Sequence, residues 1–314
     1  MLLDFLLLAA GLILLVFAGD FLVKGAAGLA ENLGIPALII GLTIVAFGTS
    51  APELMVSLQS ALTGAPDIAV GNVVGSNIAN VLLVMGLPAL IAVIRSGQRG
   101  LARNAAVMLV FTLAFMWMIS DGVLLRVEAA GLFVGLLMFV LAQILRARAH
   151  IDDEEPEDYH EELGELPHSP LRIALNLAGG IIGLPLAAHL TVAGASDLAE
   201  VFGVSQAAIG LTIVAVGTSL PELATTMAAA WRKNADVALG NVIGSNIFNI
   251  AAIMGLTGLI VPVPVSQVMI ERDMWIMLAT AILLTIICFM RFTTGKLLGG
   301  AMFVAYLAYI VSVF

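Results

Sequence analysis

Charged side chains are scarce in this sequence. Asp, Glu, Lys and Arg make up 11% of the 314 residues, whereas 61% are hydrophobic. A soluble domain carries about 25% charged residues, so this composition excludes a soluble globular protein and indicates a lipid bilayer as the solvent. A membrane-spanning helix needs about 20 apolar residues. Ten such segments are predicted, at 2–22, 35–62, 69–94, 104–120, 123–146, 170–193, 205–231, 238–261, 273–290 and 297–313.

Cysteine is nearly absent as well. The single cysteine, Cys288, lies in an apolar run, which excludes a disulfide framework. The sequence also lacks a nucleophile paired with a base and lacks a phosphate-binding loop. We therefore do not expect an enzyme, a bound cofactor or a nucleic-acid partner. The expected partners are the lipid bilayer and inorganic cations.

Negative charge is concentrated in one stretch. The net charge is −9, but nine of the acidic residues lie between Asp152 and Glu165. That stretch belongs to a long polar interval, 147–169, whose acidic clusters and prolines are typical of a linker. The chain is therefore predicted to comprise a first five-helix unit, 1–146, the acidic linker, and a second five-helix unit, 170–314.

The two predicted units contain copies of one motif. Residues 41–86 recur at 210–255 without a gap, and 25 of the 46 aligned positions are identical. Five predicted helices separate the copies, and an odd number of crossings reverses a unit relative to the membrane. The chain is therefore predicted to be an all-α integral membrane protein with ten transmembrane helices in two inverted five-helix repeats.

Lys and Arg predict the orientation of these helices. If both termini lie on one side, the loops on the opposite side hold eleven of the 13 basic residues, and the terminal side holds Arg126 and Arg272. Basic loops face the cytoplasm. We therefore expect a multi-pass protein of the inner (plasma) membrane, with both termini outside and the 147–169 linker in the cytoplasm.

Each copy of the motif interrupts an apolar helix. Residues 48–53 read GTSAPE and residues 217–222 read GTSLPE, and a proline frees a backbone carbonyl from the helix. Within a membrane such a break is tolerated only where it is buried in protein or lines a cavity. Helical spacing also places polar side chains in four stripes, which inversion is expected to bring together. The stripes are Ala46, Thr49, Glu53; Asn72, Ser76, Asn80; Ala215, Thr218, Glu222; and Asn241, Ser245, Asn249.

The two glutamates in these stripes, Glu53 and Glu222, most need an explanation. An ionised side chain at the bilayer centre costs at least about 2.5–3.5 kcal/mol, and two neighbouring carboxylates repel each other. They are therefore expected to bind protons or a cation, and their charges match one Ca²⁺, two Na⁺ or two protons. Hydroxyls, freed carbonyls and the amide oxygens of Asn80 and Asn249 would complete a shell for a hard cation. The stripes contain no Cys or His, which disfavours softer metals.

The paired motifs resemble those of a known family. G-T-S-x-P-E and G-N-V-x-G-S-N-I-x-N, each present twice, are similar to the α-repeats of the Na⁺/Ca²⁺ exchanger branch of the cation/Ca²⁺ antiporter superfamily, especially its short bacterial members. The resemblance implies ten helices in two inverted repeats, with alternating access around four central helices. It also implies that Glu53 and Glu222 ligate both Ca²⁺ and Na⁺. The further ligands that it implies are Thr49, Thr218, Ser50, Ser219, Ser76, Ser245 and the carbonyls of Ala46 and Ala215.

One position departs from the family pattern. Asn249 stands where some exchangers have an aspartate, opposite Asn80, so the site lacks a third negative charge. We predict a secondary antiporter that exchanges Ca²⁺ for Na⁺, with Ca²⁺/H⁺ exchange through the same glutamates as the alternative. A cation channel could use the same ligands, but inverted repeats with central carboxylates favour alternating access. A membrane scaffold that transports nothing would leave the buried glutamates unexplained. For the predicted exchange a monomer is sufficient.

Overall fold

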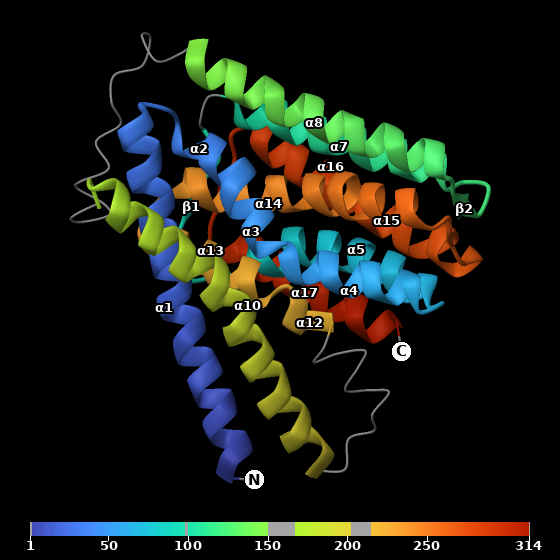
Figure 1. Ribbon diagram of the computed structural model, residues 1–314, viewed down its shortest axis with the longest axis horizontal. Coiled ribbons are helices and arrows are strands. Elements are labelled where there is room, and N and C mark those ends of the chain that lie inside the picture. The colour runs from blue at the N-terminus through green and yellow to red at the C-terminus, as the bar shows by residue number, and fades with distance from the viewer. Residues whose placement is uncertain (1, 98–99, 150–166, 202–214, 314) are drawn as a thin grey trace.

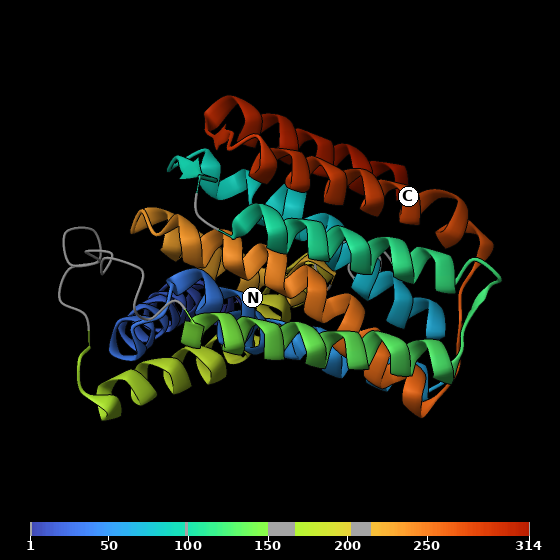
Figure 2. The same cartoon turned by 90° about the horizontal axis from the view of Figure 1, so that it is seen from above.

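The protein folds as a bundle of helices with four short strands. A computed structural model describes residues 2–97, 100–149, 167–201 and 215–313. Most helices run along the long axis of Figure 1, whereas α1 (Leu2–Leu33) and α10 (Pro170–Val201) cross the bundle steeply and lie side by side. In the view from above, the remaining helices lie roughly parallel to one another (Figure 2).

The first half of the chain is built from short helical pieces after α1. The elements that follow are α2 (Ala37–Ile40), η1 (Gly41–Val45), α3 (Ala46–Thr49), α4 (Ala51–Leu62), α5 (Pro66–Ala79), η2 (Asn80–Val84), α6 (Gly86–Ala89), β1 (Ile94–Arg95), α7 (Leu101–Met118), β2 (Val123–Leu124) and α8 (Arg126–Ala149). Here η denotes π-helix, and η1 and η2 both lie within the repeated motif.

The second half repeats this order where it is described. After α10 come α12 (Ala215–Thr218), α13 (Leu220–Trp231), α14 (Ala235–Phe248), η4 (Asn249–Met254), α15 (Gly255–Ile260), β3 (Val263–Pro264), η5 (Met269–Asp273), α16 (Met274–Phe289), β4 (Thr293–Thr294) and α17 (Lys296–Val313). A break at Ser219 and a π-helix that begins at Asn249 correspond to the break at Ser50 and the π-helix that begins at Asn80.

The predicted fold class, a helical membrane protein, is confirmed. Within the described residues, seven helices are long and apolar enough to cross a membrane, and eight if the bent pair Leu38–Thr49 and Ala51–Leu62 counts as one span. The predicted number was ten. Two predicted spans are not in this set, because α17 is apolar but shorter, and because the span predicted at 205–231 begins outside the described residues.

Two predicted helix ends were placed too early. Helix α1 was expected to end at residue 22 and continues to Leu33, and α10 was expected to end at residue 193 and continues to Val201. In α1 the helix continues past Asp20 and Lys24, because the Lys24 ammonium lies 3.0 Å from the Asp20 carboxylate one helical turn away and the two charges neutralise each other. The four two-residue strands were not predicted at all.

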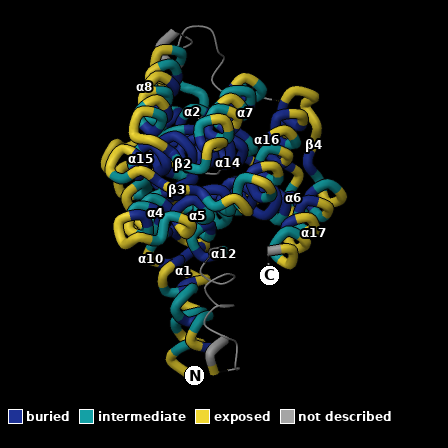
Figure 3. The backbone as a smooth tube through the Cα atoms, turned by 90° about the vertical axis from the view of Figure 1, so that its right-hand side faces the viewer, coloured by how far each residue is buried: buried dark blue, intermediate teal, exposed yellow. Residues whose placement is uncertain are grey.

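Burial separates central helices from peripheral ones. The apolar window in Pro66–Ala89 is 78% buried and that in Ala235–Ile260 is 83% buried, whereas the windows in α1, α7, α8 and α10 are only 28–33% buried. Figure 3 shows the buried residues at the centre of the bundle and exposed residues around it. Large apolar side chains such as Val127 and Leu297 cover the outside, as expected for a surface that contacts lipid.

Glycines allow a central helix to touch the polar motif. A Cβ atom at Gly244 of α14 would lie 2.7 Å from the Cβ atom of Ala46 and 2.8 Å from the carbonyl oxygen of Leu42. A Cβ atom at Gly240, one turn earlier, would lie 2.9 Å from the carbonyl oxygen of Leu38. Small residues at this spacing let two membrane helices approach closely, and here they bring α14 against η1 and α3 of the other repeat.

The short strands pair between the two halves of the chain. Strand β1 pairs with β4, and β2 pairs with β3, both antiparallel. Strands β1 and β3 follow the repeated motif at the same distance, so the two pairs are counterparts of each other. Figure 1 places β1 and β2 at opposite ends of the long axis, and the equivalent loops of the two halves therefore lie at opposite ends of the bundle.

Candidate cation-binding site

Two helices are interrupted at the same position of the repeated motif. The pieces α3 and α4 meet at Ser50 with a bend of 46° between Leu38–Thr49 and Ala51–Leu62. Ser50 has φ −82° and ψ 4°, and Ser219 has φ −88° and ψ 3°. Pro52 and Pro221 occupy the first turn of the following helix, where a missing N–H is tolerated. Each glutamate thus lies in the first turn of a new helix inside the bundle.

Threonine hydroxyls join each interrupted helix to the opposite repeat. The Thr49 hydroxyl donates to Asn241 Oδ1 at 3.2 Å, and the Thr218 hydroxyl donates to Asn72 Oδ1 at 3.4 Å. These two bonds are counterparts under the repeat offset. A third bond connects Ser219 Oγ to Ser76 Oγ at 3.5 Å. The predicted stripes therefore do face one another across the two halves.

The same asparagines hold the broken backbone through their amide nitrogens. Asn72 Nδ2 donates to the backbone carbonyl of Glu53 at 3.1 Å and to Ser57 Oγ at 2.9 Å. Asn241 Nδ2 donates to the carbonyl of Glu222 at 3.4 Å and to a hydroxyl on the next turn at 3.1 Å. Each asparagine thereby fixes the helix that carries a glutamate.

The Glu222 carboxylate accepts hydrogen bonds from both repeats. Ser50 Oγ donates to Glu222 Oε1 at 3.1 Å, and Ser245 Oγ donates to the same oxygen at 3.5 Å. The hydroxyls of Ser245 and Thr49 lie 3.4 Å apart. The second oxygen, Oε2, is buried and has no hydrogen-bond partner among the described residues, so half of this carboxylate remains available to a ligand.

The Glu53 carboxylate is even less satisfied. Its side chain is 0% exposed, and neither Oε1 nor Oε2 has a hydrogen-bond partner in the part of the chain that the structure describes. A buried ionised carboxylate without a partner is prohibitively unfavourable. Glu53 therefore needs a proton or a bound cation, and the bare oxygens are the ones that such a ligand would contact.

The structure places all twelve sequence-predicted site residues in the interrupted helices or the buried helices beside them. Thr218 is partly buried, and Ala215, predicted only for its carbonyl, begins α12. The other ten are buried: Ala46, Thr49, Ser50, Glu53, Ser76, Asn80, Ser219, Glu222, Ser245 and Asn249. The Ala46 carbonyl accepts from the Thr49 hydroxyl at 3.3 Å. Asn80 and Asn249 each keep a buried side-chain oxygen without a partner among the described residues.

Four polar residues near the site were absent from the predicted set. Ser57 and Thr226 support Asn72 and Asn241 from the following turn, and a signal for them was present, because each lies four residues after a glutamate on the same helical stripe. Asn77 and Asn246 contact the amides of Asn249 and Asn80. A signal for this last pair was present, because both asparagines belong to the identical G-S-N-I segments of the repeat.

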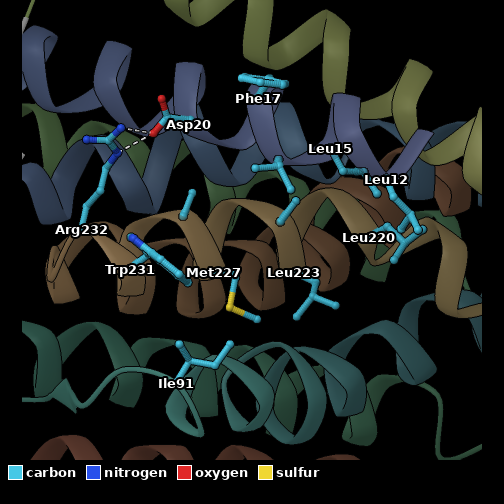
Figure 4. A pocket seen from close by; sticks show the side chains of 13 residues that line it. Leu12, Leu15, Phe17, Asp20, Ile91, Leu220, Leu223, Met227, Trp231 and Arg232 are labelled. Atoms are coloured by element: carbon cyan, nitrogen blue, oxygen red, sulfur yellow. Dashed lines mark hydrogen bonds and ion pairs between the residues drawn. The ribbon is translucent and has the colours of Figure 1, made fainter. Parts of the chain in front are cut away.

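An apolar cavity of about 670 Å³ lies beside the site, between α1 and α13. It extends along α13 from Leu220, next to the helix break, to Arg232, and Ile91 borders it from the first repeat. Figure 4 shows Asp20 of α1 paired with Arg232 at one end of the cavity. Helix α1 therefore borders α13 along an apolar surface that has an ion pair at one end.

Hard oxygen ligands around two buried carboxylates, within a bundle of membrane-spanning helices, define a membrane transporter of cations. A family model described as sodium/calcium exchanger protein matches residues 3–145 and 173–314. The chain belongs to the sodium/calcium exchanger family, and it is a membrane antiporter of Ca²⁺ and a counter-cation.

Full-length relatives agree with this family. The chain is 38% identical over 315 residues to the inner membrane protein YrbG of Escherichia coli (strain K12), with 98% of this chain and 97% of the relative covered. It is 40% identical over 288 residues to the putative antiporter CaxA of Alkalimonas amylolytica, covering 91% and 89%. It is 34% identical over 346 residues to the sodium/calcium exchanger MaX1 of Methanosarcina acetivorans, covering 99% and 98%.

A solved structure agrees as well. The sodium-calcium exchanger NCX_Mj, soaked with 2.5 mM Na⁺ and 0.1 mM Ca²⁺, superimposes with a TM-score of 0.85 at 29% identity, over 100% of this chain and 99% of that one. The resemblance to the family that the sequence motifs indicated is thus confirmed.

Proposed function

We propose that the protein exchanges Ca²⁺ for Na⁺ across the inner membrane, with both ions bound in turn at Glu53 and Glu222. The observation that carries this proposal is the Glu53 carboxylate, fully buried with two oxygens that no described residue satisfies. With Glu222 it supplies two negative charges, which one Ca²⁺ or two Na⁺ would neutralise. The hydroxyls of Thr49, Thr218, Ser50, Ser219, Ser76 and Ser245, the amide oxygens of Asn80 and Asn249, and the carbonyls of Ala46 and Ala215 supply the remaining ligands.

The architecture we propose is ten helices in two inverted repeats, 1–146 and 170–314, joined by a cytoplasmic linker at 147–169. The reciprocal bonds from Thr49 to Asn241 and from Thr218 to Asn72 support a two-fold relation between the halves. The counterpart strand pairs at opposite ends of the bundle support the inversion. The basic loops support termini on the outside.

We propose that α1 and α10 move together when access alternates. A Cβ atom at Gly180 of α10 would lie 2.5 Å from the Cβ atom of Leu22, and one at Gly11 of α1 would lie 2.4 Å from the Thr191 hydroxyl. The two helices are therefore in intimate contact with each other. Helix α1 also packs on α13, where a Cβ atom at Gly19 would lie 2.9 Å from the carbonyl oxygen of Ala224, and it borders the apolar cavity beside that contact. The pair can slide over this smooth face once the glutamates are neutralised.

Asp20→Asn is expected to loosen the contact between α1 and α13 that the Asp20–Arg232 ion pair stabilises. Loss of a partly buried pair, worth about 1 kcal/mol, shifts a two-state equilibrium about fivefold. The measurement is the rate at which a membrane-impermeant maleimide labels a cysteine introduced at Leu223, which lines the cavity. Asp121→Asn, an exposed change that keeps its bond to Val123, serves as control. Equal labelling rates in both variants would show that the ion pair does not hold α1 against α13.

The identity of the counter-ion is tested with purified protein in liposomes. Vesicles loaded with Na⁺ and diluted into Na⁺-free buffer are expected to accumulate ⁴⁵Ca²⁺, because outward Na⁺ movement is coupled to Ca²⁺ entry. A pH gradient alone is expected to give no accumulation. Ca²⁺ movement that follows only its own gradient, without any counter-ion, would identify a channel and contradict exchange.

Ca²⁺/H⁺ exchange is the second candidate, and one observation favours it. Two amides, Asn80 and Asn249, occupy the site where a third carboxylate would strengthen Na⁺ binding, so the two glutamates carry the whole negative charge. Two protons would satisfy the bare Glu53 and Glu222 oxygens as one Ca²⁺ does. Ca²⁺ uptake that a proton gradient drives, with no response to Na⁺, would establish this candidate and overturn the first.

A further inference from the structure

Two pairs of asparagine side chains connect the repeats next to the glutamates. Asn249 Nδ2 donates to Asn77 Oδ1 at 3.0 Å, and Asn80 Nδ2 donates to Asn246 Oδ1, also at 3.0 Å. All four side chains are at most 3% exposed. The two bonds are counterparts under the repeat offset. In each pair, one asparagine belongs to a ligand stripe and the other lies outside the stripes.

A methionine lies behind each outer asparagine. Asn77 Nδ2 donates to the Met277 sulfur at 3.7 Å, and Asn246 Nδ2 donates to the Met108 sulfur at 3.5 Å. Both methionines are fully buried, Met108 on α7 and Met277 on α16, and they occupy equivalent positions in the two halves. The same asparagine–methionine contact therefore occurs twice, once for each repeat, which indicates that it is a structural part of this site.

A thioether sulfur can only accept a hydrogen bond. The end of an asparagine that faces the Met277 sulfur must therefore be the NH₂ group. Asn77 has a second reason for this orientation, because its Nδ2 also donates to the backbone carbonyl of Asn246 at 3.4 Å. With its nitrogen fixed in this way, Asn77 directs its side-chain oxygen toward Asn249. The Asn249 side chain must therefore donate a hydrogen bond to that oxygen from its own nitrogen.

The consequence reaches the ligand stripes. Once the Asn249 nitrogen is used, its oxygen is left buried without a partner among the described residues. The same holds for Asn80, whose nitrogen is used by Asn246 and whose oxygen is likewise bare. The amides of Asn80 and Asn249 have nearly the same shape in either orientation, so shape alone does not decide which atom faces a cation. The direction of the hydrogen bonds, from each ligand-stripe asparagine to its outer asparagine and on to the methionine sulfur, decides which amide atom faces the cation.

We propose that Asn77 and Asn246, oriented by the sulfurs of Met277 and Met108, are positioning residues that turn the amide oxygens of Asn249 and Asn80 toward the transported cation. The proposal rests on the proposed function for the identity of that cation. If an amide rotated by half a turn, it would direct N–H donors at a positive charge. The methionines therefore exclude the repulsive orientation without touching the ion themselves.

Replacing both sulfurs by apolar groups of similar volume tests this role. Met108→Leu/Met277→Leu is expected to weaken equilibrium Ca²⁺ binding by purified protein about fivefold, because the free energy that orients the amides, about 1 kcal/mol, is lost. Met108→Gln/Met277→Gln restores an acceptor oxygen and is expected to bind within about twofold of the parent protein. Met274→Leu, an equally buried change on the same helix α16, is the matched control and is expected to bind normally.

A second readout does not depend on Ca²⁺ at all. In protein labelled with ¹⁵N-asparagine, the side-chain NH₂ resonances of Asn77 and Asn246 are expected to shift in the double leucine variant and not in Met274→Leu. Unchanged resonances, or equal loss of Ca²⁺ affinity in the double leucine, double glutamine and control variants, would overturn the positioning role. If the parent protein bound no Ca²⁺, the proposed function would fail, and the amide resonances would still decide the orientation.

Discussion

Glu53→Gln is expected to reduce Ca²⁺ exchange at least about 100-fold in reconstituted vesicles. Glutamine keeps the shape of the side chain and removes its charge, so Ca²⁺ would face only the single charge of Glu222. Removing one partner of a buried charge pair costs about 3–5 kcal/mol, which corresponds to a loss of affinity of more than 100-fold. Glu222→Gln is expected to have an effect of the same size, because Ser50 and Ser245 supply hydroxyls but no charge.

Thermal stability separates this loss from misfolding. The Glu53 carboxylate is fully buried with no described partner, so the neutral glutamine should melt at the same temperature as the parent protein or higher. Glu128→Gln is the matched control, since its carboxylate lies on an exposed helix end and accepts from the Leu125 N–H at 2.8 Å. Normal Ca²⁺ flux through a folded Glu53→Gln variant would contradict the assigned site.

Much of the site could be predicted because its information is local. The break at Gly48–Pro52, the glutamate after it and the stripe from Asn72 to Asn80 all follow from spacing along single helices. The repeat then doubled each observation, so two copies of a weak pattern became a strong one. The bonds that link Thr49 to Asn241 and Thr218 to Asn72 agree with the expectation that these stripes face each other.

Contacts between the repeats could not be predicted in the same way. Asn77 lies next to the Ser76 stripe rather than in it, and its importance comes from Asn249 and Met277, which are 172 and 200 residues away. Hydropathy likewise placed the end of α1 too early. The i,i+4 spacing of Asp20 and Lys24 predicts their local pair, which the structure contains, but the bond from Asp20 to Arg232, 212 residues away, depends on the folded structure.

The two glutamates also differ in their hydrogen bonds, which the sequence does not predict. Their local sequences, GTSAPE and GTSLPE, are nearly identical, yet Glu222 accepts from Ser50 and Ser245 while Glu53 accepts from no described side chain. Nearly identical sequences in unequal surroundings fit the proposed alternating access, in which the inverted halves would adopt different conformations in one state and exchange them in the other. Under the proposed mechanism, Glu53 would gain the corresponding serine contacts when access reverses.

Asn249→Asp is expected to make exchange respond to the membrane potential. The proposed two-carboxylate site would balance one Ca²⁺ against two monovalent cations, so exchange by the parent protein should move no net charge. A third carboxylate would admit a third counter-cation and one net charge per cycle. Moving one charge through 100 mV is worth about 2.3 kcal/mol. The Ca²⁺ ratio that the variant reaches should therefore shift about 50-fold per 100 mV, and that of the parent protein should not shift.

Asn249→Asp also changes a hydrogen bond, so the effect of that change has to be distinguished from the effect of the added charge. Asn249 Nδ2 donates to Asn77 Oδ1 at 3.0 Å, and an ionised aspartate there would oppose one acceptor with another until a cation binds between them. The additional Na⁺ is thus the natural partner of the new carboxylate. Asn234→Asp adds the same charge at the start of α14, where its oxygen still caps the Val237 N–H, and should leave exchange neutral. A voltage response in the parent protein, or none in Asn249→Asp with intact flux, would show that the amides at Asn80 and Asn249 do not set the number of counter-ions.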